Sequence, residues 1–138
     1  IYLACRRAKF PKCLDELVLS SDCIDKREIS KTYRLLAREL ELNVPLLSPC
    51  DYLPKISSNL ALPFNVTNKA KEILQAAISK GLSSGRNPMS MCAAVIYIAS
   101  RMENYPIKQK DIASASNVTD MTLRARYNEI IEKLEIII

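Results

Sequence analysis

The 138-residue chain contains no histidine, only two glycines and few aromatic residues. Without histidine it lacks the commonest general base and one of the two usual zinc ligands. The five cysteines never form a Cys-x-x-Cys pair and lie scattered at Cys5, Cys13, Cys23, Cys50 and Cys92. We therefore expect no zinc site or other cofactor within the chain, and we interpret the cysteines as small buried thiols of a reducing compartment.

Other absences narrow the class of protein further. No apolar run is long enough to span a membrane, and no signal peptide is visible. There is no glycine-rich phosphate loop, and Cys92 lies in an apolar segment without an obvious base. We therefore do not expect an enzyme. The composition, dominated by Leu, Ile, Ala, Lys and Glu, favours an all-α protein.

Apolar periodicity and capping signals divide the chain into helical segments. Asp25 and Glu28 have the spacing of a capping box, and Asn87 with Pro88 is typical of a helix start. Residues 89–102 are apolar on every side, which predicts a buried central helix. Residues 43–54 contain three prolines and are predicted to be a linker. The expected helices are 1–9, 14–20, one of about four turns that starts at the cap Asp25, 51–62, 67–80, 88–103, 108–115 and 119–135.

The segment 108–128 is predicted to be a helix-turn-helix. Asn117 lies in the predicted turn and tolerates a left-handed backbone, and Thr119 is placed to cap the second helix. The outward face of that helix carries Met121 and Arg124. In a DNA-binding helix-turn-helix such residues meet base edges in the major groove, with arginine on guanine and an apolar side chain on the thymine methyl. The alternative is a solvated helix face on which the arginines are surface charges.

The positive charge is concentrated before this segment. The chain carries a formal charge of +5, and residues 55–110 alone hold eight basic and two acidic residues, a net +6. A basic surface of this kind suits phosphate contacts. Arg86 lies just before a predicted helix N-terminus, where free N–H groups favour a phosphate. An ordinary loop charge is the alternative for Arg86.

The chain contains an internal repeat. Residues 1–11 align with residues 96–106 at an offset of 95, and Ile, Tyr, Ala, Arg and Pro recur in place. After one extra residue the offset becomes 94, and the apolar positions from Ile29 to Leu42 fall on those from Leu123 to Ile136. We expect 1–44 to be the C-terminal part of a first repeat, cut from a longer protein, and 45–138 to be a complete five-helix second repeat. The shortened first repeat would expose an apolar face, and self-association through it is expected.

GRNPMSMCAAVIYIAS (85–100) and QKDIASASNVTDMTLRARYNEI (109–130) resemble the core domain of the transcription factor B family, called TFIIB in eukaryotes and TFB in archaea. The residues of these motifs look closer to the archaeal form of the family. The resemblance implies a cyclin-like fold and a general transcription initiation factor. The implied partners are the TATA-binding protein, promoter double-stranded DNA and, in the full-length protein, RNA polymerase. A zinc ribbon would lie upstream. An intracellular location follows, in the cytoplasm or nucleoid of an archaeon or in a eukaryotic nucleus.

In this family the second repeat's helix-turn-helix reads a promoter element upstream of the TATA box. Carried onto this sequence, Met121 and Arg124 read bases, supported by Thr122. Lys108 and Gln109 hold phosphates, and Arg86 and Arg126 are assigned to the same phosphate-contacting group. In the first repeat, Lys31, Arg34 and Arg38 would touch the TATA-binding protein or DNA, unless they form a solvated face.

Two departures from the family pattern affect this interpretation. Met121 stands where a smaller β-branched residue is usual, and Asn117 stands where glycine is usual. The Met121 departure predicts a different base preference, whereas asparagine is tolerated in a left-handed turn. The alternative function is a cyclin-like protein-binding module without sequence-specific DNA binding, because fold alone does not separate the two.

Overall fold

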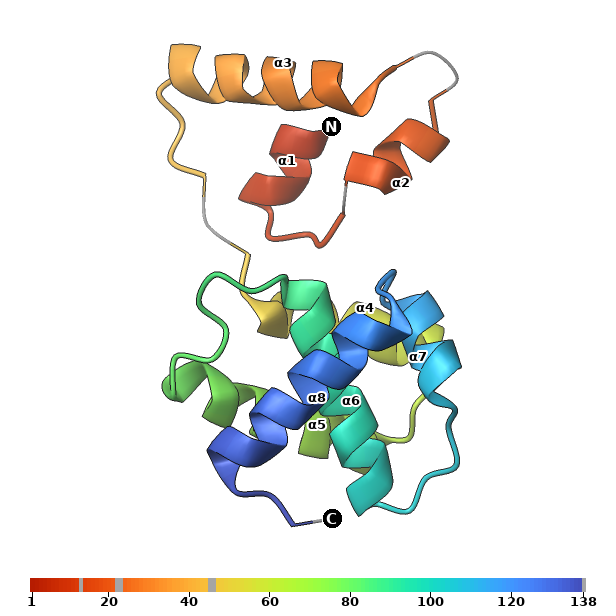
Figure 1. The fold of residues 1–138 in the computed structure, drawn as a ribbon. Coiled ribbons are helices and arrows are strands. Elements are labelled where there is room, and N and C mark those ends of the chain that lie inside the picture. Colours follow the sequence, from red (N-terminus) through yellow and green to blue (C-terminus); the bar gives the residue numbers. More distant parts are fainter. Residues whose placement is uncertain (13, 22–23, 45–46, 138) are drawn as a thin grey trace. The chain divides into compact units, whose positions relative to one another are not determined.

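The computed structural model describes residues 1–12, 14–21, 24–44 and 47–137. Over these ranges the ordered elements are helices and no strand is present, which confirms the all-α prediction (Figure 1). The chain divides into two compact units, Ile1–Leu47 and Ser48–Ile138. The sequence had placed the boundary after residue 44. Among the described helices, none has both the length and the apolar character to cross a lipid bilayer.

The first unit contains three helices, α1 (Tyr2–Arg7), α2 (Leu14–Leu19) and α3 (Lys26–Glu39). Both shorter helices pack against α3. Lys26 Nζ forms an ion pair with Asp15 Oδ1 at 2.8 Å. Asp25 is the N-cap of α3, but its side chain makes no cap hydrogen bond, so the predicted capping box with Glu28 is wrong.

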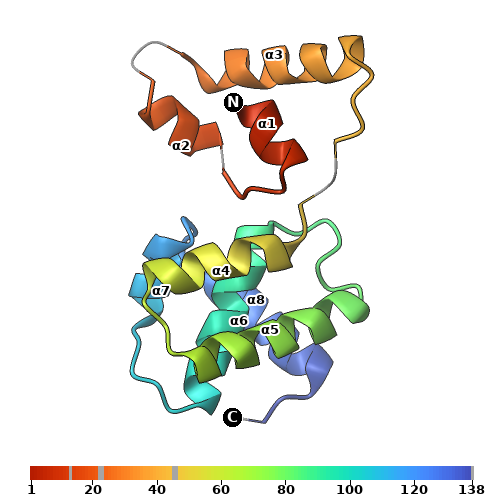
Figure 2. The ribbon, with the colours of Figure 1, turned by 180° about the vertical axis from the view of Figure 1, so that it is seen from behind.

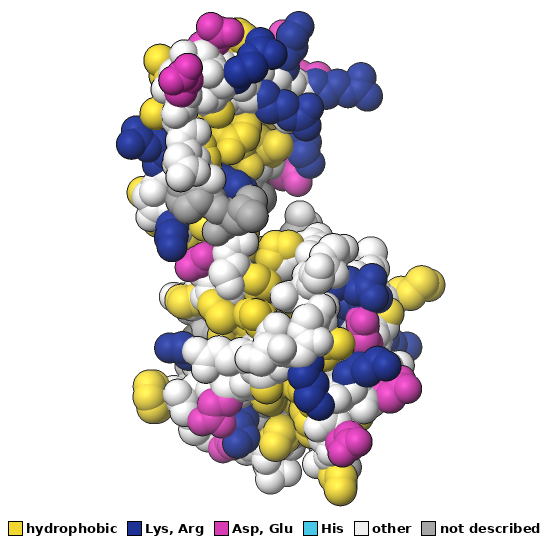
Figure 3. Space-filling model, turned by 90° about the vertical axis from the view of Figure 1, so that its left-hand side faces the viewer, with side chains coloured by type: hydrophobic (Ala, Val, Ile, Leu, Met, Phe, Trp, Pro, Cys, Tyr) yellow, Lys and Arg dark blue, Asp and Glu magenta, His cyan; other side chains and the backbone are white. Residues whose placement is uncertain are grey.

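The first unit buries little of its apolar surface. Leu17, at 8% exposure, is the only buried apolar residue among its described residues. Figure 3 shows apolar side chains at the surface of this unit, bordered by lysine and arginine. The large apolar side chains that remain exposed in it are Ile1, Phe10, Leu19, Ile24, Leu35, Leu36 and Leu40. An exposed apolar surface of this kind is what the sequence predicted for this part of the chain.

The second unit is built around one buried helix. Its helices are α4 (Pro49–Asn59), α5 (Phe64–Ser79), α6 (Pro88–Met102), α7 (Gln109–Ala115) and α8 (Asp120–Leu134). Figure 1 shows α8 crossing one side of α6, and Figure 2 shows α4 and α5 on the other side. Residues 90–96 and 98–100 of α6 are buried. The predicted buried central helix is therefore confirmed, and it fixes the neighbouring helices by apolar packing.

The starts of α6 and α4 show how local sequence sets helix ends. The Asn87 side chain accepts a hydrogen bond from Met89 N at 2.9 Å, and Pro88 is the first helical residue, both as predicted. For α4 the predicted start near Asp51 is two residues late, because the helix begins at Pro49; Pro54 lies inside it, as the expected range 51–62 implies. Ser48 and Asp51 form a capping box at this earlier start. Pro54 removes one helical hydrogen bond, and burial of the same helix against α6 offsets that loss.

The residues that follow aligned helices of the predicted repeat have similar backbone geometry. Lys9 and Asn104, aligned at the offset of 95, both have a left-handed backbone just after a helix, with φ of 54° and 53°. Glu41 and Glu135, aligned at the offset of 94, follow α3 and α8 with φ of 49° and 52°. Ala61 after α4 and Asn117 after α7 have the same left-handed backbone, with φ of 49° and 53°, so this geometry marks helix ends in general. It agrees with the alignment of the two units but does not by itself establish the repeat.

Aromatic pairs repeat in the same way. The Tyr2 and Tyr33 ring centroids are 4.9 Å apart in the first unit. The aligned rings of Tyr97 and Tyr127 are 5.1 Å apart in the second unit. The first pair joins α1 to α3, and the second pair joins α6 to α8. The α1–α3 pair thus has the same internal contact as the α6–α8 pair.

Candidate nucleic-acid interface

The turn between α7 and α8 is a short helix-turn-helix connection closed by backbone hydrogen bonds. Ser116 ends α7, and Asn117 follows with φ of 53°, as its role in the turn predicted. Val118 N donates to Ala113 O at 3.0 Å, which closes the end of α7. Thr119 Oγ1 accepts a hydrogen bond from Thr122 N at 3.2 Å, so the predicted N-cap of α8 is confirmed.

Buried apolar residues hold the two helices against α6. Ile112 and Ala113 of α7 are buried, as are Leu123 and Ile130 of α8. Because residues three and four apart share one helix face, this packing leaves the opposite face of α8 toward solvent. The packing of α6 therefore decides which side chains of α8 are available to a partner.

The residues predicted to read bases lie at the exposed N-terminal part of α8. The Met121 side chain is 81% exposed, and Arg124 lies one turn further along the helix. Thr122 is also exposed, but its hydroxyl lies 2.8 Å from the Thr119 hydroxyl. An exposed methionine presents an apolar surface, and a neighbouring arginine presents paired N–H donors. Thr122 already has a hydrogen-bond partner within the cap.

Gln109 links the two helices through Arg124. Arg124 Nε donates to Gln109 Oε1 at 3.3 Å, and Gln109 Nε2 donates to Asp120 O at 3.4 Å. This contact leaves the two terminal nitrogens of Arg124 for another acceptor. Gln109 was predicted to hold a phosphate, whereas the geometry places it where it orients Arg124. Lys108 is exposed at the N-cap of α7.

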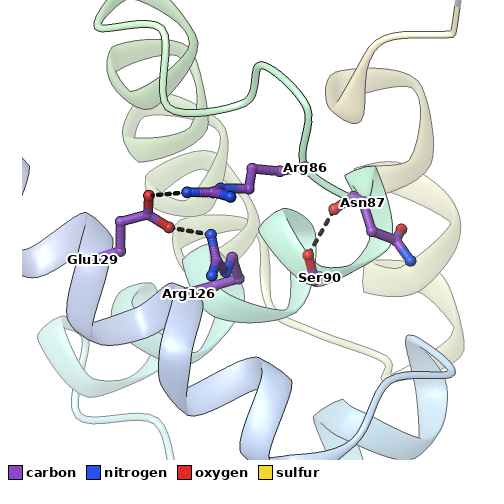
Figure 4. Close-up of polar contacts among 5 residues, drawn as sticks. All are labelled: Arg86, Asn87, Ser90, Arg126 and Glu129. Carbon is purple, nitrogen blue, oxygen red and sulfur yellow. Dashed lines mark hydrogen bonds and ion pairs between the residues drawn. The ribbon is translucent and has the colours of Figure 1, made fainter.

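Arg86 and Arg126, both predicted to contact phosphate, lie on one carboxylate that the sequence reading missed. Arg86 Nη2 is 3.0 Å from Glu129 Oε1, and Arg126 Nη1 pairs with Glu129 Oε2 (Figure 4). Arg126 and Glu129 are three residues apart on α8, a spacing at which helix side chains meet. The spacing of three residues could therefore have predicted the Arg126–Glu129 ion pair from the sequence. No pattern in the sequence points to the Arg86 contact.

Lys31, Arg34 and Arg38 lie on α3 in the first unit, where all three are exposed. Their spacing of three and four places them on one face of the helix. Together with Arg27, Ser30 and Leu35 they line a surface hollow. Arg38 also lies 3.8 Å from Glu39 in an exposed ion pair, which contributes little to stability.

The environment of Cys92 disfavours the ionised form of its thiol. Cys92 is buried in α6 and its thiol donates to Pro49 O at 3.0 Å. Burial, and to a lesser extent the neighbouring Cys50, raises the pKa of the Cys92 thiol to about 12. The thiolate needed for nucleophilic attack is therefore scarce at neutral pH. Cys5 and Cys50 are also free thiols, while Cys13 and Cys23 lie outside the described residues.

A compact helical unit with a helix-turn-helix on its surface defines a class of protein, and comparison with known sequences identifies the family. The family described as "Transcription factor TFIIB repeat" matches residues 42–133. The chain belongs to this family and corresponds to its core domain. The match covers α4 to α7 and all of α8 except its last residue, Leu134.

Curated relatives align over nearly the whole chain. A protein named "Transcription initiation factor IIB" from Methanocaldococcus jannaschii is 46% identical over 136 residues, which are 99% of this chain and 20% of that protein. One of the same name from Methanococcus aeolicus is 46% identical, again over 99% of this chain, and 40% of its own length is covered. "Transcription initiation factor IIB 1" of Thermococcus kodakarensis is 41% identical over 138 residues, 46% of that protein. The chain thus spans less than half the length of these relatives.

Proposed function

We propose that this chain is the core of a general transcription initiation factor. In this proposal it binds the complex of TATA-binding protein and promoter DNA, and it reads an upstream promoter element through α7 and α8. The family match and the names of the relatives support the initiation role. RNA polymerase recruitment and an upstream zinc ribbon belong to the proposal for the longer protein.

The observation that carries base reading is the pair of exposed side chains near the start of α8. Met121 stands out as an 81% exposed apolar residue, and Arg124 is oriented by Gln109 through a 3.3 Å hydrogen bond. When such a helix lies in the major groove, the terminal nitrogens of Arg124 match guanine O6 and N7. Met121 fits the methyl group of a thymine. Lys108, at the start of α7, is placed to contact the DNA backbone.

The alternative is a protein-binding module that uses the same fold without reading sequence. The decisive experiment is a mobility-shift titration with this chain, an archaeal TATA-binding protein and promoter DNA. The element upstream of the TATA box is either intact or scrambled, with the base composition kept the same. We expect a ternary complex that weakens on scrambling, because α8 then loses its base contacts. A complex indifferent to scrambling would contradict base reading and support a role limited to protein contacts.

A further inference from the structure

Glu129 is shared by two arginines that come from different parts of the second unit (Figure 4). Arg126 precedes it by three residues on α8, whereas Arg86 belongs to the loop between α5 and α6. Each arginine contacts a different carboxylate oxygen, at 3.0 Å in the case of Arg86. Glu129 therefore ties the loop before α6 to the helix that carries Arg124.

The three side chains differ in exposure. Those of Glu129 and Arg126 are 23% and 20% exposed, whereas that of Arg86 is 44% exposed. Arg86 is thus the outer member of the cluster, and its guanidinium has more N–H donors than the contact with Glu129 uses. A long side chain that is already held loses less conformational freedom when it binds a ligand. The ion pair therefore prepares Arg86 for an anion on its open side.

The cluster of Glu129 with Arg86 and Arg126 is not shared by the two units. At the offset of 94, the positions of Arg126 and Glu129 correspond to Thr32 and Leu35 of α3. Neither can form the ion pair, although α3 and α8 end with the same backbone geometry. The cluster accompanies the helix that carries Arg124 and is absent from its counterpart. This distribution is expected for a group that serves the interface rather than the fold.

We infer that Glu129 is a positioning residue that holds Arg86 against α8 to contact a phosphate of the DNA backbone. Arg126 balances the charge of Glu129 and makes no phosphate contact of its own. The inference rests on the proposed function and deepens it. It assigns the phosphate contact to one arginine of the pair and gives the half-buried carboxylate a role in the proposed interface.

The variant Glu129→Gln distinguishes positioning of Arg86 from a general charge effect, because the two predict opposite changes in DNA affinity. The substitution raises the formal charge of the chain from +5 to +6, so charge alone predicts tighter binding to DNA. A glutamine amide has only one oxygen, and its NH₂ group faces one of the two guanidinium groups. Arg86 is then no longer held in place. Positioning therefore predicts weaker binding despite the added positive charge.

The experiment measures the affinity of the chain for an archaeal TATA-binding protein on promoter DNA across a series of salt concentrations. Each phosphate contact contributes roughly 0.9 to the slope of log affinity against log salt concentration. We expect Glu129→Gln to lower the affinity severalfold at low salt and to make this slope shallower by about 0.9, as one phosphate contact would. The double variant Arg86→Ala/Glu129→Gln should lose no more than Arg86→Ala alone. Glu132→Gln makes the same charge change at an exposed position of α8 and should not weaken binding.

A second pair of variants tests the assignment without changing Glu129. Arg86→Gln should flatten the salt dependence by about 0.9, whereas Arg126→Gln should leave it unchanged, because only Arg86 touches a phosphate. Circular dichroism and thermal unfolding of every variant identify losses that come from misfolding. This pair decides the question if Glu129→Gln does not fold.

Tighter binding by Glu129→Gln, or equal flattening by Arg86→Gln and Arg126→Gln, would overturn the positioning role. Weakening by Glu132→Gln to the same degree would also overturn it, since the effect would then not be specific to Glu129. Failure of the unmodified chain to form a salt-dependent complex would reject the proposed function, and the inference with it. A normal complex in which Glu129→Gln binds more tightly would reject the inference alone.

Discussion

Replacing Arg124 with alanine tests base reading most directly. Its Nε is engaged by Gln109 at 3.3 Å, and its two terminal nitrogens are the donors that a guanine would accept. A bidentate arginine–guanine pair contributes about 1–3 kcal/mol of discrimination, so Arg124→Ala should weaken binding to the intact element roughly 5- to 150-fold. The loss should concentrate at one base pair.

Folding should change little in the same variant. Arg124 is exposed, and Gln109 becomes solvated rather than left as a buried unsatisfied group when the arginine is removed. We therefore expect the free energy of unfolding to change by no more than about 0.5 kcal/mol. Thermal unfolding of Arg124→Ala beside the unmodified chain checks this expectation. A loss of binding can then be read as a loss of contact.

The assay is a set of mobility-shift titrations on promoter DNA in which each base pair of the upstream element is changed in turn. Arg124→Ala should bind all variants of one position equally while it keeps its preferences elsewhere. Lys108→Ala should instead weaken binding uniformly and flatten the salt dependence. Arg101→Ala removes the same side chain from an exposed position at the end of α6 and serves as the matched control. Identical, sequence-independent losses for Arg124→Ala and Lys108→Ala would refute base reading by Arg124.

Four further predictions concern the fold itself. Thr119→Ala removes the α8 cap and should lower the free energy of unfolding by about 0.5–2 kcal/mol in denaturant titration, whereas an unchanged midpoint would argue against the cap. Ile130→Ala, at a fully buried position, should cost about 2–5 kcal/mol by the same measurement, and a cost below 1 kcal/mol would contradict its place in the core. Cys92 should stay unreactive to thiol reagents at pH 8 until the chain unfolds. Folding raises the pKa of the Cys92 thiol from about 9 to about 12. The contribution of Cys92 to the free energy of unfolding is therefore fully present at neutral pH, and it declines as the pH rises above about 9. The exposed apolar side chains of the first unit should produce concentration-dependent association in sedimentation, which Leu35→Glu should reduce; a monomer at all concentrations would reject that expectation.

The helix-turn-helix was predictable because its determinants are local. Asn117 supplies the left-handed turn residue and Thr119 supplies the cap, and each acts on backbone groups within a few positions. The buried stripe on α8 follows from the helical period in the same way. Each of these determinants acts between residues that are close together in the sequence. The structure therefore agrees with the sequence closely in this segment.

The start of α4 was predicted two residues late. The three prolines between residues 43 and 54 predict a linker that reaches to about Asp51, whereas α4 begins at Pro49, the favoured first position of a helix. Pro54 lies inside α4, as the expected helix 51–62 implies. A proline inside a helix costs about 3 kcal/mol, and burial of Leu53 and Ile56 against the core offsets it. The capping signal was also assigned to the wrong helix. Asp25 makes no cap hydrogen bond, whereas Ser48 does.

The contacts that matter most to the interface join residues far apart in the chain. Arg124 meets Gln109 from fifteen residues away, and Glu129 meets Arg86 from forty-three residues away. Counting charges along the sequence treats Arg86, Arg126 and Lys108 as equal contributors to a basic surface. The structure places the first two on one carboxylate, so that the three side chains of that cluster together carry a net charge of +1 rather than +2. The number of phosphates contacted should therefore follow the geometry of the cluster rather than the count of basic residues, and the salt dependence of DNA binding is the quantity that reports it.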